Sequence, residues 1–179
     1  MSPIEIALVL LLVHAMLGAF DTFYNHEYRE RLPSRAGSTA ELALHSVRSA
    51  LFALTFVGLA WCEWHGAWAW MPLIVIATEY AVTLADSVVE DSTRRLAAVE
   101  RLTHMLLALN TGLYAALVGM QVLGDWINRP TAVNPVFYPW LTWALTGCGA
   151  ATALWMVRDG WASLKNRLGK RDAQLLADF

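Results

Sequence analysis

The feature that most constrains this chain is its repeated long apolar runs. The segments 4–23, 42–61, 68–85, 103–123 and 136–157 each have roughly the ~20 residues with which a helix crosses a ~30 Å hydrocarbon core. Together they take up most of the 179 residues, so almost no chain is left for a soluble domain. We therefore expect an all-α integral membrane protein with five transmembrane helices.

The composition supports this expectation and excludes several classes of protein. Hydrophobic residues make up 57% of the chain and charged residues only 16%, which is too apolar for a soluble domain of this size. The two cysteines form no C-x-x-C pair, so neither a disulfide scaffold nor a dithiol redox motif is expected. Nothing in the sequence predicts a nucleic-acid partner.

The basic residues predict an orientation. All of the 13 lysines and arginines except Arg129 lie in or beside segments that would share one side of the membrane with the C-terminus. Positive residues stay on the cytoplasmic side, so we expect the N-terminus outside and the C-terminus inside, in a bacterial inner membrane. We expect a transmembrane domain over 1–160 and a basic amphipathic tail over 161–179 that lies on the inner leaflet. Small residues on the last two spans allow close helix packing. A homo-oligomer is possible.

Two Glu–His pairs recur at helical spacing near the expected cytoplasmic end. Glu41 and His45 are four residues apart at the start of the second span, and Glu100 and His104 repeat that spacing at the start of the fourth. At about 100° per residue, a separation of four places both side chains on one face, one turn apart. Each pair is therefore a preformed two-point ligand.

Further carboxylates lie at matching depths on the first and third spans. Counted at ~1.5 Å per residue from the inner boundary, two layers are expected: first Asp21, His45, Asp86 and His104, then Glu41, Glu90 and Glu100 one turn nearer the cytoplasm. A charge in hydrocarbon costs at least about 2.5–3.5 kcal/mol, so such residues normally face the bundle interior and have partners. We therefore expect four of the helices to form a bundle with a polar interior at its cytoplasmic end.

This inventory of side chains predicts a metal centre. Several carboxylates in one small volume repel one another unless protons or cations compensate them. Carboxylate and imidazole ligands that project inward from four helices are similar to those of di-iron and di-manganese bundles, although those use Glu-x-x-His and this chain has a spacing of four. The expected ligands of two divalent ions are Asp21, Glu41, His45, Asp86, Glu90, Glu100 and His104. Iron is the expected metal, with manganese and zinc as alternatives.

Some nearby residues are optional ligands or supporting groups in this scheme. His26 follows Asp21 by five residues, about 140° around a regular helix, so His26 and Glu27 are optional ligands. Arg48 and Arg101 are expected to orient the carboxylates. Alternatively, Glu100 simply pairs with one of the basic residues Arg94, Arg95 and Arg101.

Two polar residues lie about 10 Å deeper than the metal ligands. His14 and Glu79 are the candidate catalytic residues, as a hydrogen-bonded pair at the floor of a cavity or on a proton path toward the metal. The alternative is a structural pair that fixes the helix register.

These features predict a membrane-embedded di-metal oxidoreductase of the hydroxylase, desaturase or oxidase type. Its substrate would be a lipid-like molecule or a quinone that enters from the leaflet, and a cytoplasmic donor would supply electrons. Three alternatives stay open. They are a haem-b cytochrome with His45 and His104 as axial ligands, an ion or proton carrier, and a non-catalytic assembly factor.

Overall fold

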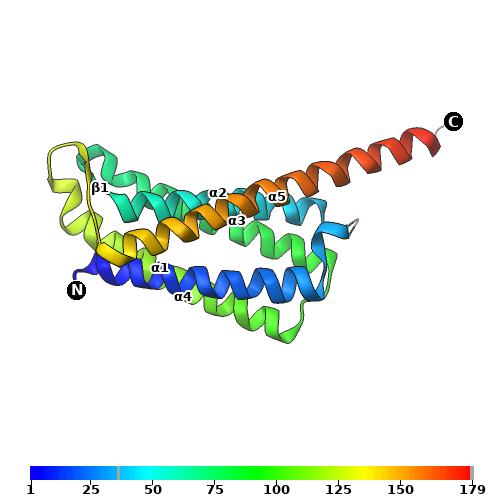
Figure 1. Ribbon diagram of the computed structural model, residues 1–179, viewed down its shortest axis with the longest axis horizontal. Coiled ribbons are helices and arrows are strands. Elements are labelled where there is room, and N and C mark those ends of the chain that lie inside the picture. The colour runs from blue at the N-terminus through cyan, green and yellow to red at the C-terminus, as the bar shows by residue number, and fades with distance from the viewer. Residues whose placement is uncertain (36, 178–179) are drawn as a thin grey trace.

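The structure, a computed structural model, describes residues 1–35 and 37–177. Its long helices are α1 (Pro3–Phe20), α2 (Thr39–Trp61), α3 (Trp70–Thr93), α4 (Ala98–Gly124) and α5 (Pro139–Ala177). They run alongside one another as an elongated bundle (Figure 1). Within the described residues, five helical segments are long and apolar enough to span a membrane. The expected all-α fold with five candidate spans is confirmed at this level.

Apolar side chains fill the middle of the molecule and also cover its outside. α2 packs mainly against α5 and α3, and α1 packs against α4. The residues Leu8, Leu11, Phe56, Leu59 and Val118 are buried between these helices. Large apolar residues on the outer faces are exposed, among them Leu54, Ile74, Leu109, Met120 and Leu154. An apolar exterior of this extent is typical of a surface that lipid chains cover.

One end of the bundle is closed by a short β-ribbon that the sequence analysis did not anticipate. β1 (Cys62–His65) pairs antiparallel with β2 (Ala132–Pro135), and the 3-10 helices η3 (Gly66–Ala69) and η4 (Trp126–Asn128) adjoin this pair. Gly66 has a φ of 58°, and a Cβ atom there would collide with Thr131. The turn after β1 therefore requires glycine.

The opposite end, here called the polar end, holds the expected ligands. It comprises the π-helix η1 (Asp21–Arg29), the 3-10 helix η2 (Leu32–Ser34), the last turns of α3, the connection 94–97 and the first turns of α2 and α4. The apolar run of the third span stops near residue 85, but α3 continues to Thr93. This extension keeps Asp86 and Glu90 on the same helix as Glu79.

The last helix passes through the expected domain boundary without a break. α5 is continuous across residue 160 and reaches Ala177, and its C-terminal part projects beyond the other helices (Figure 1). The binding of 161–179 to a membrane surface stays a prediction, and residues 178–179 of that segment lie outside the described part of the chain.

Candidate metal centre

Three buried glutamates from three helices surround the guanidinium of Arg94. The Nη2 atom of Arg94 lies 2.9 Å from Oε1 of Glu41 on α2 and 3.2 Å from Oε1 of Glu90 on α3. It also lies 2.6 Å from Oε1 of Glu100 on α4, whose Oε2 accepts a second hydrogen bond from Nη1 at 2.8 Å. All four side chains are at most 3% exposed. Glu41 and Glu100 also lie in the first turns of their helices, where the exposed N–H groups favour negative charge.

A layer of imidazoles and aspartates lies next to the three glutamates. The Nε2 atom of His45 is 3.0 Å from Oδ2 of Asp86, which also accepts a hydrogen bond of 2.9 Å from Arg48. The Nε2 atom of His104 is 3.2 Å from Oδ2 of Asp21. The residues expected at the same height, His45 with Asp86 and Asp21 with His104, are thus in contact in the structure.

The π-helix explains how His26 joins this layer. In η1 the backbone pairs over five residues instead of four, so residues five apart lie on one face. Asp21 and His26 therefore point the same way, and His26 Nε2 lies 3.4 Å from Asp21 Oδ2 and 3.6 Å from Glu100 Oε1. The ring of His26 also stacks on that of His45, with centroids 4.6 Å apart. The π-helix, which is wound less tightly than an α-helix, thus provides the local change of helix geometry that His26 needs.

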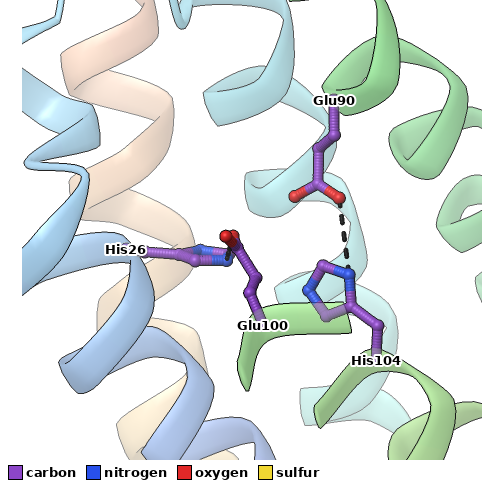
Figure 2. Close-up of side chains that lie close together, drawn as sticks. All are labelled: His26, Glu90, Glu100 and His104. Atoms are coloured by element: carbon purple, nitrogen blue, oxygen red, sulfur yellow. Dashed lines mark ion pairs between the residues drawn. The ribbon is translucent and has the colours of Figure 1, made fainter. Parts of the chain in front are cut away.

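The side chains form two overlapping sets of candidate ligands. His26, Glu90, Glu100 and His104 offer ligand atoms within 4.8 Å of one another, and so do Glu41, His45 and Glu90. Figure 2 shows His26, Glu90, Glu100 and His104 pointing toward a common volume. Glu90 belongs to both sets: its Oε2 lies 3.5 Å from His104 Nδ1 and its Oε1 lies 3.9 Å from His45 Nε2.

The cluster has more negative than positive side chains. Its carboxylates are Asp21, Glu41, Asp86, Glu90 and Glu100, all at most 2% exposed. Arg48 and Arg94 are the guanidinium groups in contact with them, so five negative charges face two positive ones. In addition, carboxylate oxygens lie near the buried Nε2 atoms of His26 and His45, but none of them is aligned as a hydrogen bond among the described residues. Burying unbalanced charge and unpaired nitrogen is costly, so the cluster needs further cations or protons.

Arg94 takes the place that the sequence analysis gave to Arg101. Arg101 is exposed, whereas the buried side chain of Arg94 contacts all three glutamates. Burial lowers the pKa of Arg94, but its hydrogen bonds to Glu100 and Glu41 outweigh that effect and hold the pKa above its ordinary value. The Arg94 side chain therefore always carries its positive charge. The alternative that Glu100 pairs with a nearby arginine is correct for Arg94.

The two deeper residues contact a shared tyrosine instead of one another. The hydroxyl groups of Thr83 and Tyr114 lie 2.8 Å and 3.5 Å from the two carboxylate oxygens of Glu79. His14 packs edge-on against the Tyr114 ring, and its Nδ1 is 3.4 Å from the amide nitrogen of Asn110. The described hydrogen bonds thus replace the expected direct bond between His14 and Glu79 with bonds to neighbouring side chains.

A small cavity reaches the imidazole layer from the side. It lies between η1, α2 and α5 and offers about 30 Å³ to water-sized molecules. Its lining includes His26, His45, Arg48, Ser49, Trp155 and Arg158. This volume suits about two water molecules and is far too small for a lipid or a porphyrin.

The structure brings all seven expected ligands together at the polar end, five of them in the ligand sets and two beside the imidazoles. Glu41, His45, Glu90, Glu100 and His104 belong to the two ligand sets, while Asp21 and Asp86 lie beside the imidazoles. Of the two optional residues, His26 joins the cluster and Glu27 pairs instead with Arg158.

Comparison with known protein families, curated proteins and solved structures gives no match to this chain.

Proposed function

We propose that the cluster at the polar end binds two divalent metal ions and that the protein is a membrane-embedded di-metal carboxylate oxidoreductase. The observation that carries this proposal is the pair of buried ligand sets that share Glu90. A carboxylate between two ligand sets can bridge two ions. The Nε2 atoms of His26 and His45 lack an aligned hydrogen bond, so they are available as nitrogen ligands, and they already lie near the carboxylates.

The charge balance supports bound cations. Five carboxylates against Arg48 and Arg94 leave a formal charge of −3, which two divalent ions would change to +1. Without metal, balance requires protonation of the three imidazoles or of some carboxylates, and the cluster would then be a purely structural ion-pair network. The two explanations differ in metal content, which can be measured directly.

The donor set favours particular metals. All members of the two ligand sets are carboxylates and imidazoles. Both cysteines lie outside them, Cys62 in β1 and Cys148 in α5. Oxygen and nitrogen donors suit iron, manganese or zinc, and of these iron and manganese change oxidation state readily. Iron is our first choice for an oxidoreductase.

We assign the reaction to oxygen-dependent oxidation of an apolar molecule. A bound redox pair would supply the electron transfer to dioxygen. Desaturation takes two electrons and two protons from a substrate C–C unit, and a donor supplies two more electrons and two protons, so O2 becomes two waters. Oxidation of two quinols by one O2 balances without another donor. The small cavity beside His26 and His45 is a suitable route for dioxygen and water.

The outer surface supports a substrate that enters from the bilayer. The exposed apolar residues of the helices favour a lipid-like or quinone substrate that arrives from the bilayer. Following the distribution of basic residues, we place the polar end and the C-terminus at the cytoplasmic face of a bacterial inner membrane, where an electron donor could dock.

Glu79 and His14 are proposed to handle protons. The hydroxyl of Thr83 donates a hydrogen bond to Glu79, and Asp86 lies about one turn beyond Thr83 on the same helix. This arrangement provides hydroxyl and carboxyl groups between the middle of the bundle and the cluster.

The core beyond His14 is lined by Leu8, Leu11 and other apolar side chains. A polar route across the whole bundle, as an ion carrier needs, is therefore disfavoured.

Haem ligation by His45 and His104 is disfavoured by the neighbours of these residues. The ring of His26 lies 4.6 Å from that of His45 and 6.4 Å from that of His104, in the region that a porphyrin would need. Carboxylates occupy the remaining contacts of both imidazoles.

Elemental analysis of detergent-purified protein, combined with an optical spectrum, tests the proposal. We expect two iron or manganese ions per chain and no Soret band. The double variant His45→Ala/His104→Ala should lose most of this metal, whereas His65→Ala at the opposite end of the bundle should keep it. Metal-free wild-type protein, or unchanged metal in the double variant, would contradict the proposal. Quinol-dependent or lipid-dependent O2 consumption then tests the reaction class.

A further inference from the structure

The side chain of Arg94 lies where a metal cation would be expected. Its Nη2 atom has three carboxylate oxygens within 3.2 Å, one each from Glu41, Glu90 and Glu100. These oxygens come from three different helices. A nitrogen enclosed by carboxylates in this way is in the environment that a divalent ion selects.

The same carboxylates belong to the proposed metal ligands. Arg94 binds both oxygens of Glu100 and the Oε1 atoms of Glu41 and Glu90. Glu41 Oε1 accepts two of these hydrogen bonds, and each oxygen of Glu100 accepts one, so the lone pairs that a metal would use are already engaged. Arg94 and a full pair of ions therefore compete for the same oxygens.

Arg94 also has a path out of the cluster. It is the first residue after α3, in the four-residue connection 94–97 that links α3 to α4. The neighbouring Arg95 is exposed, so the connection borders solvent or the lipid headgroups. A long side chain anchored there can move outward without a change in either helix.

We infer that Arg94 is an internal substitute for one of the two metal ions, and that it must withdraw before the second ion binds. The inference rests on the proposed function because it assigns an order of loading to the same site. The first ion binds while the guanidinium still compensates the glutamates. The second ion binds more weakly because it must displace Arg94 from them. Arg94 thus sets the occupancy of the centre.

A titration of metal-stripped, detergent-purified protein with Mn²⁺ tests this inference. Wild-type protein should show one tight and one weaker binding step. In Arg94→Gln the weaker step should become tighter by about tenfold or more, because the competing charge is gone. The adjacent exposed residue provides the matched control, and Arg95→Gln should titrate like the wild type. Electron paramagnetic resonance distinguishes single from coupled Mn²⁺ ions during the titration.

Thermal stability gives a second measurement that does not depend on activity. Without metal, Arg94→Gln leaves three buried glutamates without their guanidinium and should melt well below Arg95→Gln. Added Mn²⁺ should then raise the melting temperature of Arg94→Gln more than that of the wild type. A variant that can be purified only with Mn²⁺ present also supports the inference. If Arg94→Gln cannot be purified at all, Arg94→Lys must show a tighter second step than the wild type, because one ammonium group cannot make all the hydrogen bonds that the guanidinium makes to Glu41, Glu90 and Glu100.

The outcomes separate the two proposals. If wild-type protein binds two ions and Arg94→Gln binds the second with equal or lower affinity, Arg94 holds the ligands in place and the inference is wrong while the metal centre stands. If wild-type protein binds none but Arg94→Gln binds Mn²⁺, Arg94 is a permanent substitute and the proposed function is wrong. If neither protein binds metal, both proposals are wrong.

Discussion

The shared position of Glu90 leads to a sharp prediction about metal stoichiometry. The change is Glu90→Gln, which keeps the size of the side chain and removes its charge. Because the two oxygens of Glu90 lie 3.5 Å from His104 Nδ1 and 3.9 Å from His45 Nε2, an ion in either ligand set would lie close to this carboxylate. Both ions should therefore be affected.

The size of the effect follows from Coulomb's law. Two unit charges 4 Å apart interact by about 4 kcal/mol at an effective dielectric constant near 20. A divalent ion interacts at least this strongly with one carboxylate, so its loss corresponds to at least about a 10³-fold weaker affinity for each ion. Glu41 belongs to one ligand set only. Glu41→Gln should therefore lower the affinity for one ion and leave the affinity for the other unchanged.

The assay is metal content by mass spectrometry after equilibration with equal Mn²⁺ concentrations. Glu90→Gln should retain almost no metal and Glu41→Gln about one ion per chain. The matched control is Asp91→Asn, an exposed neighbour on α3, which should retain two. Two ions bound to Glu90→Gln with wild-type affinity would refute the bridging role, and equal losses in Glu90→Gln and Glu41→Gln would refute the assignment of two sets.

Three further predictions concern the surroundings of the cluster. Asp86→Asn should weaken metal binding by about 10–100-fold, because this carboxylate orients His45. A Mn²⁺ titration measures the affinity, and a wild-type value would show that His45 does not need Asp86 for its orientation. Glu79→Gln should keep the metal content and lower the rate of O2 consumption, whereas an unchanged rate would remove Glu79 from proton transfer. Removal of metal by a chelator should lower the melting temperature by about 5 °C or more. An ion present at 100 times its dissociation constant stabilises the folded state by about 2.7 kcal/mol. An unchanged melting temperature would indicate that the folded chain binds no metal.

Helical periodicity made much of the site predictable from the sequence. The spacing of four in Glu41/His45 and Glu100/His104 defines a face of each helix without any tertiary information, and the structure places these residues in adjoining ligand sets. The rise per residue likewise anticipated which side chains meet, such as His45 with Asp86 and His104 with Asp21. Such reasoning works because a regular helix fixes both direction and height.

Where the backbone departs from a regular α-helix, the same reasoning fails. The angle between Asp21 and His26 is unfavourable at 3.6 residues per turn and favourable in the π-helix, which the local sequence does not reveal. Arg94 lies in a connection, where no periodicity predicts its direction. The sequence analysis offered Arg94 only as one of three possible partners of Glu100. Two sequence signals favour it over Arg95 and Arg101: its i, i+4 spacing from Glu90, and the shortage of positive charge among so many acids.

The limits of the helices also depend on tertiary contacts. α3 extends past its apolar run to Thr93, and the side chain that follows it is held by glutamates from two other helices. The pairing of β1 with β2 joins segments almost 70 residues apart in the chain, and four-residue strands carry too little pattern to predict that register.

X-ray absorption spectroscopy of the metal-loaded protein tests the central claim most directly. We predict a first shell of oxygen and nitrogen with imidazole scattering, and a second metal about 3.5–4 Å from the first. Sulfur in the first shell, or a single ion without a metal neighbour at saturating metal, would contradict a di-metal centre built on Glu90.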